Sequence, residues 1–179
     1  DIITGVKTSD NNIFKGDAVI VATGHSARDI FHLLHDKQIK IEAKSFALGV
    51  RIEHPQPLID KIQYHQLTSH RAIYLPPASY SLVEQVNEHG VFSFCMCPGG
   101  IIAPAATNPG ELVVNGWSPS KRNNPFANSG MVVNVEEKDI PAFRKYGTLA
   151  MMYFQQSIEQ KAYNAGGGKF AAPAQRMVD

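Results

Sequence analysis

The chain has 179 residues, of which 44% are hydrophobic and 18% are charged. These proportions are those of an ordinary globular protein, and the length suffices for one well-buried domain, or for one domain and part of another. The 17 basic and 16 acidic residues are spread along the chain and leave a net charge of +1. We therefore expect no nucleic-acid partner, because no basic stripe is present. We expect no membrane partner, because apolar runs such as 18–22 are only strand-length.

The first residue indicates where the natural chain begins, and the two cysteines indicate the redox state of its compartment. The chain begins at Asp1, in what reads as the middle of a strand, with neither an initiator methionine nor a signal peptide. We expect the true N-terminus to lie upstream. In an extended segment the Cα atoms of Cys95 and Cys97 would be roughly 6.5–7 Å apart, at or beyond the usual limit for a disulfide. Reduced thiols in a cytoplasmic protein are the default interpretation.

The first forty residues have the pattern of half an α/β unit. The predicted elements are strands at 2–8, 13–15 and 18–22 and a helix at 27–34. The strand at 18–22 shows no alternation of polar and apolar residues, so we expect it to be buried on both faces. Ser26 is the predicted N-cap of the helix.

Beyond about Lys40 the pattern becomes mainly that of strands. Strands are predicted at 45–53, 80–86, 90–97, 111–117 and 131–135, and helices at 56–63 and 147–163. The polar stretch 65–79, with two prolines, predicts a loop. The sequence therefore predicts an α+β fold, with a mainly antiparallel or mixed sheet and flanking helices. Residues 1–24 have the character of a different layer.

Ala22, Thr23 and Gly24 follow directly on the apolar strand at 18–22. Small residues at the carboxyl end of a strand let the backbone approach a nucleotide closely. Plain packing also explains small residues at a strand end, so this segment alone leaves the question open.

A second segment runs from Phe92 through Cys97 to Gly100. Strand alternation places its side chains on two faces: Phe92, Phe94 and Met96 on one, and Ser93, Cys95 and Cys97 on the other. Pro98 ends the strand, and Gly99 and Gly100 open a turn that can approach a flat ring closely. A core strand that ends in a tight turn is the alternative. We expect no metal site, because two sulfurs without a nearby histidine pair are too few ligands.

Several polar residues are candidates for a substrate pocket. Arg51 and Glu53 share one face of the strand at 45–53, and His54 faces the other way. A surface ion pair explains Arg51 and Glu53, whereas the alternative is that Arg51 and His54 line a pocket for an anionic group. Two loops rich in hydrogen-bonding residues, 114–122 and 124–130, either carry function or are ordinary polar turns.

Taken in order, these segments resemble the bacterial FAD-dependent dehydrogenases of the NAD(P)/FAD-dependent oxidoreductase family. The residues that carry the resemblance are 22–29, 49–56, 94–100, Asn115, Gly116, Ser118, Arg122, 127–129, 165–167 and 174–176. The match spans nearly the whole chain. Trp117 departs from it, since a smaller residue is expected there. The larger departure is truncation, because the glycine-rich phosphate loop and the C-terminal return to the FAD domain are both missing.

The resemblance implies a domain layout and a set of site residues. Residues 1–24 would be a remnant of the FAD-binding domain, and 25–179 an inserted substrate or cap domain, incomplete at its C-terminus, that covers the flavin. The implied FAD contacts are Ala22, Thr23, Gly24, Cys97, Pro98, Gly99 and Gly100. The implied candidates for the substrate pocket are Arg51, His54, Asn115, Arg122 and Asn128. The partners would be FAD and an unidentified small-molecule substrate, with NAD(P)H as a candidate electron donor, and no catalytic residue is assigned.

Activity is thus expected of the full-length protein and not of this fragment. Without the phosphate loop, which holds the pyrophosphate at a helix N-terminus, we expect no tight binding of FAD to the fragment. Two other hypotheses stay open. One is a non-catalytic binding domain that keeps the cofactor motifs for structural reasons, and the other is a cysteine-dependent enzyme that uses Cys97.

Overall fold

A computed structural model describes residues 2–65 and 73–178 of the chain. The described residues form two compact units that divide between Lys40 and Ile41. The predicted loop at 65–79 lies partly outside the described residues, and its described part, residues 65 and 73–79, contains no helix or strand.

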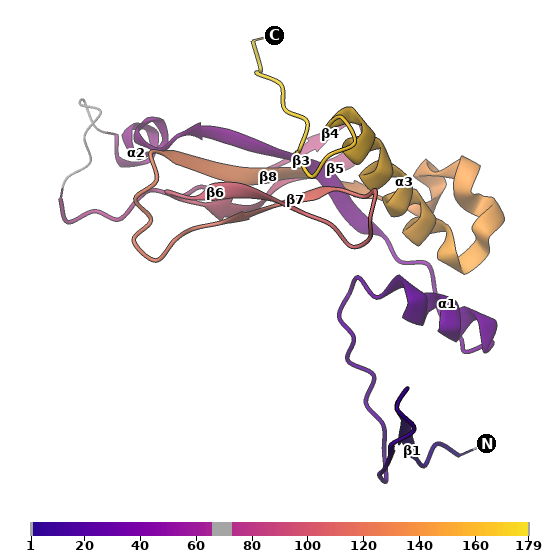
Figure 1. Cartoon of the computed structure of the whole chain (residues 1–179). Helices are drawn as coiled ribbons and strands as arrows, with labels where there is room; N and C mark the ends of the chain where they lie inside the picture. Colours follow the sequence, from indigo (N-terminus) through magenta and orange to yellow (C-terminus); the bar gives the residue numbers. More distant parts are fainter. Residues whose placement is uncertain (1, 66–72, 179) are drawn as a thin grey trace. The chain divides into compact units, whose positions relative to one another are not determined.

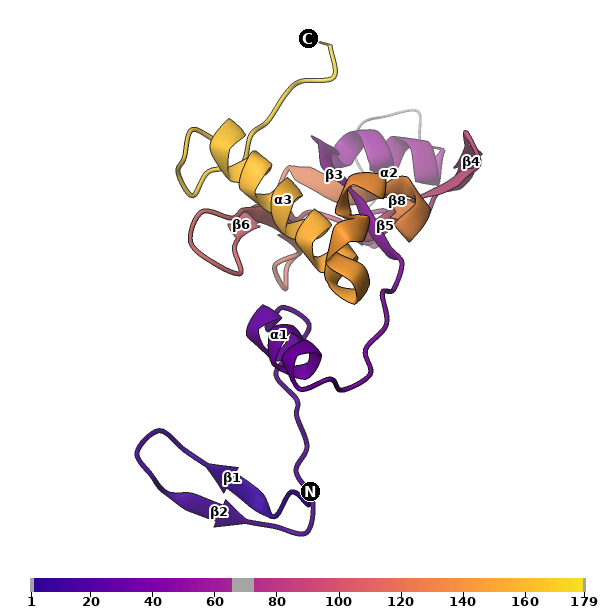
Figure 2. The same ribbon diagram turned by 90° about the vertical axis from the view of Figure 1, so that its right-hand side faces the viewer.

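The first unit contains a two-stranded hairpin and one helix. Its elements are β1 (Gly5–Lys7), β2 (Ile13–Lys15) and α1 (Arg28–Asp36). The hairpin is antiparallel, with Val6 opposite Phe14, and both of its strands are visible in Figure 2.

Two predictions for the first unit are wrong. Residues 18–22 are extended but pair with no strand among the described residues, and Ile20 is 88% exposed. A strand buried on both faces needs neighbours that cover it, and the described part of the chain supplies none here. Ser26 is not the N-cap of α1, since that position is taken by Ala27. The Ser26 hydroxyl instead forms a hydrogen bond of 2.6 Å with Nδ1 of His25.

The second unit is built on a four-stranded antiparallel sheet with the strand order β3-β8-β5-β4. The strands are β3 (Phe46–Pro55), β4 (Val83–Val86), β5 (His89–Cys97) and β8 (Phe126–Val135). The longest pairing joins β3 to β8, from Phe46 opposite Val135 to Pro55 opposite Phe126. Pro55 is tolerated because it lies at the end of an edge strand, where its missing N–H costs no ladder hydrogen bond.

A second hairpin packs on this sheet. It consists of β6 (Ile101–Ala105) and β7 (Val113–Trp117), and it contacts β5 and β8. No strand is predicted at 101–105 from the sequence, where Pro104 argues against a central strand. In a two-stranded sheet every strand is an edge, so the proline is accommodated.

The helices lie at the two ends of the main sheet (Figure 1). They are α2 (Gln56–Tyr64), the 3-10 helices η1 (Glu137–Asp139) and η2 (Pro141–Leu149), and α3 (Ala150–Ala165). Gly147, with a φ of 55°, interrupts the helical backbone, so α3 begins at Ala150 rather than at the predicted 147. Among the described residues, no helix is both long enough and apolar enough to cross a membrane.

The hydrophobic core of the second unit lies where α3 and η2 meet β3 and β8. Its buried members are Val135, Ile140, Ala150 and Met151, and Phe46, Leu48, Phe143 and Phe154 pack against them. Phe143 and Phe154 meet edge to face, with ring centroids 5.4 Å apart. The predicted α+β class is confirmed.

Candidate functional site

A polar cluster centred on Arg51 occupies one face of the main sheet. From β3, Arg51 Nε donates a hydrogen bond of 3.1 Å to Oδ1 of Asn128 on β8. Its Nη2 donates a second bond of 2.6 Å to the carbonyl oxygen of Cys95 on β5. Three strands therefore hold the guanidinium. The alternative interpretation, a surface ion pair between Arg51 and Glu53, does not account for these contacts.

Asn128 is the most enclosed polar member of this cluster. Its side chain is fully buried, with 0% of its surface exposed. The amide oxygen accepts from Arg51, whereas the amide nitrogen Nδ2 is buried and has no hydrogen-bond partner among the described residues. A buried donor left unpaired costs about 1–3 kcal/mol, so native structures retain few of them. Asn128 is thus a buried donor that the described residues leave without a hydrogen bond.

Gly116 on β7 is what lets the hairpin lie against this pair. A Cβ at Gly116 would lie 2.1 Å from Oδ1 of Asn128 and 2.4 Å from Cζ of Arg51. Any side chain there would displace one or both groups. The predicted candidate Asn115, its neighbour, is exposed.

The thiol of Cys97 lies beside the same guanidinium. Its Sγ is 3.9 Å from Nη2 of Arg51 and 4.0 Å from Sγ of Cys95. Cys97 is buried and Cys95 is exposed. Burial raises the pKa of the Cys97 thiol, and the neighbouring Cys95 adds to this, while the Arg51 charge opposes it. A raised pKa disfavours the thiolate, so the geometry does not favour Cys97 as the nucleophile of a cysteine-dependent enzyme.

The backbone at Cys95 explains why the two thiols are close. The pairing of β5 with β8 shifts register between Phe94 and Cys97, and Cys95 has a φ of 48°. Such a bulge breaks the alternation of side chains between two faces. A regular extended strand was expected here, yet the sulfurs of Cys95 and Cys97 lie 4.0 Å apart, as expected for two side chains on one face. Phe94 is 61% exposed.

The Pro98-Gly99-Gly100 turn is held by protein on all sides. The N–H of Gly99 donates a bond of 2.7 Å to Oε1 of Gln56 at the start of α2. Gly99 has a φ of 50°, and a Cβ on it would lie 2.0 Å from the carbonyl oxygen of Arg122. A Cβ on Gly100 would lie 2.6 Å from the carbonyl oxygen of Trp117. The close approach of protein backbone thus accounts for both glycines, and contact of this turn with a flavin stays a prediction.

Sequence reasoning gave no role to Gln56, although this residue organises the turn. Its side chain is 4% exposed, and Nε2 donates to Oδ1 of Asp60 at 2.8 Å and to the Ala78 carbonyl at 3.0 Å. Asp60 Oδ1 also accepts from the Ala78 N–H at 2.7 Å. The available signal is a glutamine and an aspartate four apart at the start of a helix, a spacing that places both on one face.

His54 lies on the opposite face of β3 from Arg51, because successive side chains of a strand alternate. Its ring packs on Tyr80, with centroids 5.5 Å apart, and neither ring nitrogen has a hydrogen-bond partner among the described residues. Burial lowers the pKa of His54, and the backbone of Ile52 and the charge of Glu53 oppose this. The predicted pocket shared by Arg51 and His54 is therefore not formed by these two side chains.

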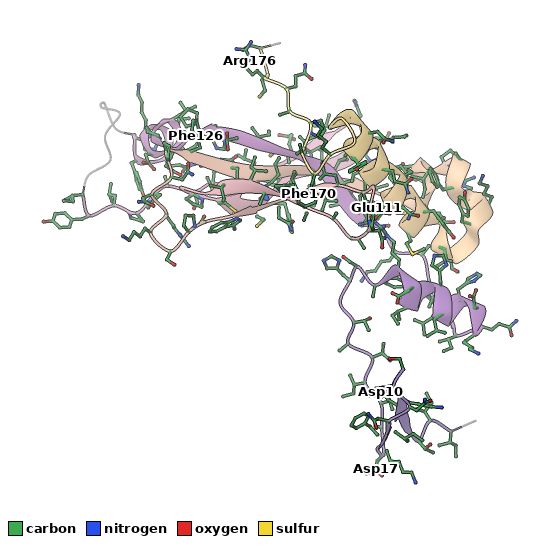
Figure 3. All side chains as sticks on the ribbon, in the orientation of Figure 1. Asp10, Asp17, Glu111, Phe126, Phe170 and Arg176 are labelled. Carbon is green, nitrogen blue, oxygen red and sulfur yellow. The ribbon has the colours of Figure 1, made fainter. Side chains whose placement is uncertain are left out.

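Arg122 and Glu111 lie outside the cluster around Arg51. The side chain of Arg122 is exposed, and only its backbone, with a φ of 47°, closes over Gly99. Glu111, labelled in Figure 3, is 2% exposed and accepts a bond of 2.8 Å from Nε2 of Gln156 on α3. The buried carboxylate thereby ties the segment before β7 to α3. Among the described residues, no three metal-ligating side chains gather in one place.

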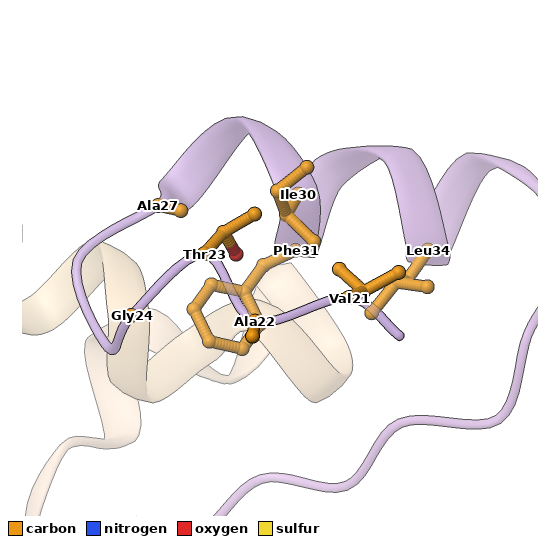
Figure 4. Close-up of a pocket in the computed structure, with 8 residues that line it drawn as sticks. All are labelled: Val21, Ala22, Thr23, Gly24, Ala27, Ile30, Phe31 and Leu34. Carbon is orange, nitrogen blue, oxygen red and sulfur yellow. The ribbon is translucent and has the colours of Figure 1, made fainter. Parts of the chain in front are cut away.

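The predicted FAD-contact segment of the first unit lines a hollow of about 290 Å³ (Figure 4). The lining residues are Val21, Ala22, Thr23, Gly24, Ala27, Ile30, Phe31 and Leu34. Most of this surface is apolar and comes from the extended segment and from α1. Gly24 has a φ of 79°, and a Cβ on it would meet no atom within 4 Å. This segment borders a hollow, and its contact with FAD stays a prediction.

Comparison with known proteins places these features in a family. A family model described as "FAD-dependent protein, C-terminal domain-like" matches residues 45–179. The chain belongs to this family of FAD-dependent proteins. The match lies within the second unit and contains Arg51, Cys97, Gly116 and Asn128. The resemblance to FAD-dependent proteins is thus confirmed, whereas the narrower assignment to dehydrogenases stays a prediction.

One relative of this FAD-dependent family member is an uncharacterized protein of Clostridium beijerinckii. It is 42% identical over 165 residues, which make up 91% of this chain and 30% of that protein. The chain thus spans under a third of the relative's length, so the activity and partners of a whole protein are matters for proposal.

Proposed function

We propose that this chain supplies the substrate-side domain of a longer FAD-dependent oxidoreductase. The observation that carries the proposal is the guanidinium of Arg51, which Asn128 and the Cys95 carbonyl hold in place. Family membership supplies the cofactor class. The layout predicted from the sequence, with 1–24 in the FAD domain and 25–179 in the cap, is part of this proposal.

Arg51, positioned by Asn128, forms an anchor for an anionic or carbonyl-bearing small molecule. Arg51 offers a delocalised positive charge, and its Nε and Nη2 are already fixed by Asn128 and by the Cys95 carbonyl. A guanidinium held in this way loses little side-chain entropy when it binds a carboxylate. The N–H of Asn128 beside the charge is unpaired but buried, so the role of Asn128 is to position Arg51. These residues bind and orient, and we assign no proton transfer to either of them.

FAD, when bound, would supply the redox chemistry. The residues that fit it best in this chain are Ala22, Thr23 and Gly24, because they line a hollow and Gly24 leaves its Cα face open. The N–H of Gly99 already donates a hydrogen bond to Gln56, so it is not free to bind FAD. We therefore assign the Pro98-Gly99-Gly100 turn only a packing contact near the flavin ring. An NAD(P)H electron donor and a cytoplasmic location also belong to the proposal.

The first test concerns the cofactor. We expect the full-length gene product to be yellow as purified and to show the absorbance bands of bound FAD. Titration of FAD into the 179-residue chain should reveal weak affinity at most. Anaerobic addition of NADH or NADPH should bleach the bands if either is the donor. A full-length protein without flavin would contradict the proposal and favour a non-catalytic binding domain.

The second test concerns the anchor, in the flavin-loaded full-length protein. Benzoate, a small planar carboxylate, should perturb the flavin spectrum in a saturable way. We expect Arg51→Gln to weaken this binding by about 10–100-fold, the equivalent of one charge-assisted hydrogen bond, and Arg51→Lys to fall between. Arg144→Gln is the matched control, because Arg144 is exposed on η2. Unchanged binding in Arg51→Gln would remove Arg51 from the site.

A further inference from the structure

The two cysteines form a pair with a geometry that a regular strand does not give. The bulge in β5, where Cys95 has a φ of 48°, brings the two Sγ atoms to 4.0 Å, although the residues are only two apart in sequence. In a disulfide the sulfurs are about 2.05 Å apart, so closure requires the two sulfurs to approach each other by roughly 2 Å. Rotation of the exposed Cys95 side chain can supply most of that movement.

The two thiols have unlike surroundings. Cys95 is exposed and open to a reagent in solution, whereas Cys97 is 5% exposed. The guanidinium of Arg51 lies 3.9 Å from Cys97 Sγ, and its positive charge partly opposes the rise in the Cys97 pKa that burial causes. An exposed thiol that meets the oxidant, followed by a buried thiol that resolves the adduct, is the arrangement that disulfide formation needs.

We propose that Cys95 and Cys97 are a redox-active dithiol that closes to an intrachain disulfide by exchange with a small-molecule disulfide. In the first step the Cys95 thiolate attacks one sulfur of the reagent, the reagent's S–S bond breaks, and one small thiol leaves. In the second step Cys97 Sγ attacks the Cys95 sulfur and displaces the second small thiol, which takes up the proton. The protein is oxidised by two electrons and the reagent is reduced to two thiols.

The surroundings of Cys97 also set the pH dependence of closure. The groups that face its sulfur are the Cys95 thiol and the Arg51 guanidinium. Because burial holds the pKa of Cys97 above its ordinary value of 9.0, the thiolate is scarce at neutral pH. The rate of the second step should therefore keep rising as the pH passes 9.0.

The test uses the full chain, which contains 2 cysteines and thus no other thiol. After incubation with glutathione disulfide, the intact mass should fall by two hydrogens, and peptide mapping should place the link between Cys95 and Cys97. Cys97→Ser should accumulate a stable glutathione adduct on Cys95. Cys95→Ser should react at least about 10-fold more slowly, because its remaining thiol is buried.

Two results would overturn the proposal. One is a wild-type chain that keeps a glutathione adduct without closing, and the other is a disulfide that links two copies of the chain. Peptide mapping of the wild type decides between these results and closure even if Cys97→Ser does not fold. The test is independent of the proposed flavin function, because the exchange needs neither FAD nor the anchor's ligand.

Discussion

Two glycine-bearing segments of the chain have similar sequences of small residues but very different surroundings. Gly24, in the first unit, follows an extended apolar segment and has open space around its Cα. Gly99 and Gly100, in the second unit, are buried against the backbone of Arg122 and Trp117. All of these glycines fit a cofactor-contact motif by sequence. A glycine can mark a place where a ligand approaches or a place where the protein approaches itself, and only the neighbours distinguish the two.

The largest expected effect is the difference in unfolding free energy between an alanine substitution at the enclosed Gly99 and one at the open Gly24. Gly99→Ala should lower the free energy of unfolding of the second unit by about 3–5 kcal/mol, because the new methyl group meets the Arg122 carbonyl and the residue must keep a positive φ. Gly24→Ala meets no atom, and its cost is confined to the positive φ, about 1–2 kcal/mol within the first unit.

Urea unfolding monitored by tryptophan fluorescence measures this contrast, because Trp117, the single tryptophan, lies on β7 in the second unit. Gly24→Ala should leave that transition in place. Equal shifts for the two variants would mean that the enclosure of Gly99 is not what requires glycine there.

The next prediction concerns the hydrogen bonds through which Gln56 holds the Pro98-Gly99-Gly100 turn in place. Gln56→Glu keeps the acceptor for the Gly99 N–H but replaces the donor to Asp60 and to the Ala78 carbonyl with an oxygen. We expect a loss of about 2–4 kcal/mol at neutral pH, since a buried carboxylate then faces two acceptors.

The pH dependence of this variant has a definite sign. In the folded state the introduced carboxyl has a raised pKa, so the loss should shrink as the pH falls and the carboxyl becomes protonated. Gln63→Glu is the control, because Gln63 is exposed on the same helix. Similar destabilisation by both variants would show that charge on α2, rather than the bond to the turn, is responsible.

The α+β class could be predicted from the sequence. Nine elements could also be placed to within a few residues, because apolar patterns and turn residues such as Pro55 and Gly166 mark their ends. The sequence could not predict β8 over 126–130, because the Ala-Asn-Ser-Gly segment is covered on both faces and shows no alternation. The Arg51–Asn128 contact joins residues 77 apart, and the bulge at Cys95 depends on the pairing with β8. Both arise from tertiary structure that no local pattern encodes.

A smaller effect extends the comparison to the other face of the main sheet. Because burial lowers the pKa of His54, the unfolded chain binds a proton there more readily than the folded chain. Stability should therefore fall as the pH drops below 6.5, the ordinary pKa of histidine, and it should reach a plateau below the folded pKa. His54→Phe keeps the ring contact with Tyr80, so the difference in unfolding free energy between wild type and variant should vary with pH in this window. A constant difference would mean that His54 is not shielded from water.

The smallest expected effect concerns the turn between β1 and β2 in the first unit, whose residues are exposed. Asp10 is fully exposed, yet hydrogen bonds from the Thr8 side chain and the Asn12 backbone lower its pKa below the ordinary value of 3.8. A lowered carboxyl pKa stabilises the turn above that value and ceases to do so as the pH falls through the folded pKa. NMR titration of the full chain should show the lowered midpoint in the wild type and its return toward 3.8 in Thr8→Val. A wild-type midpoint at 3.8 would mean that the turn between β1 and β2 does not persist in solution, and that the first unit needs more than its own residues to be ordered.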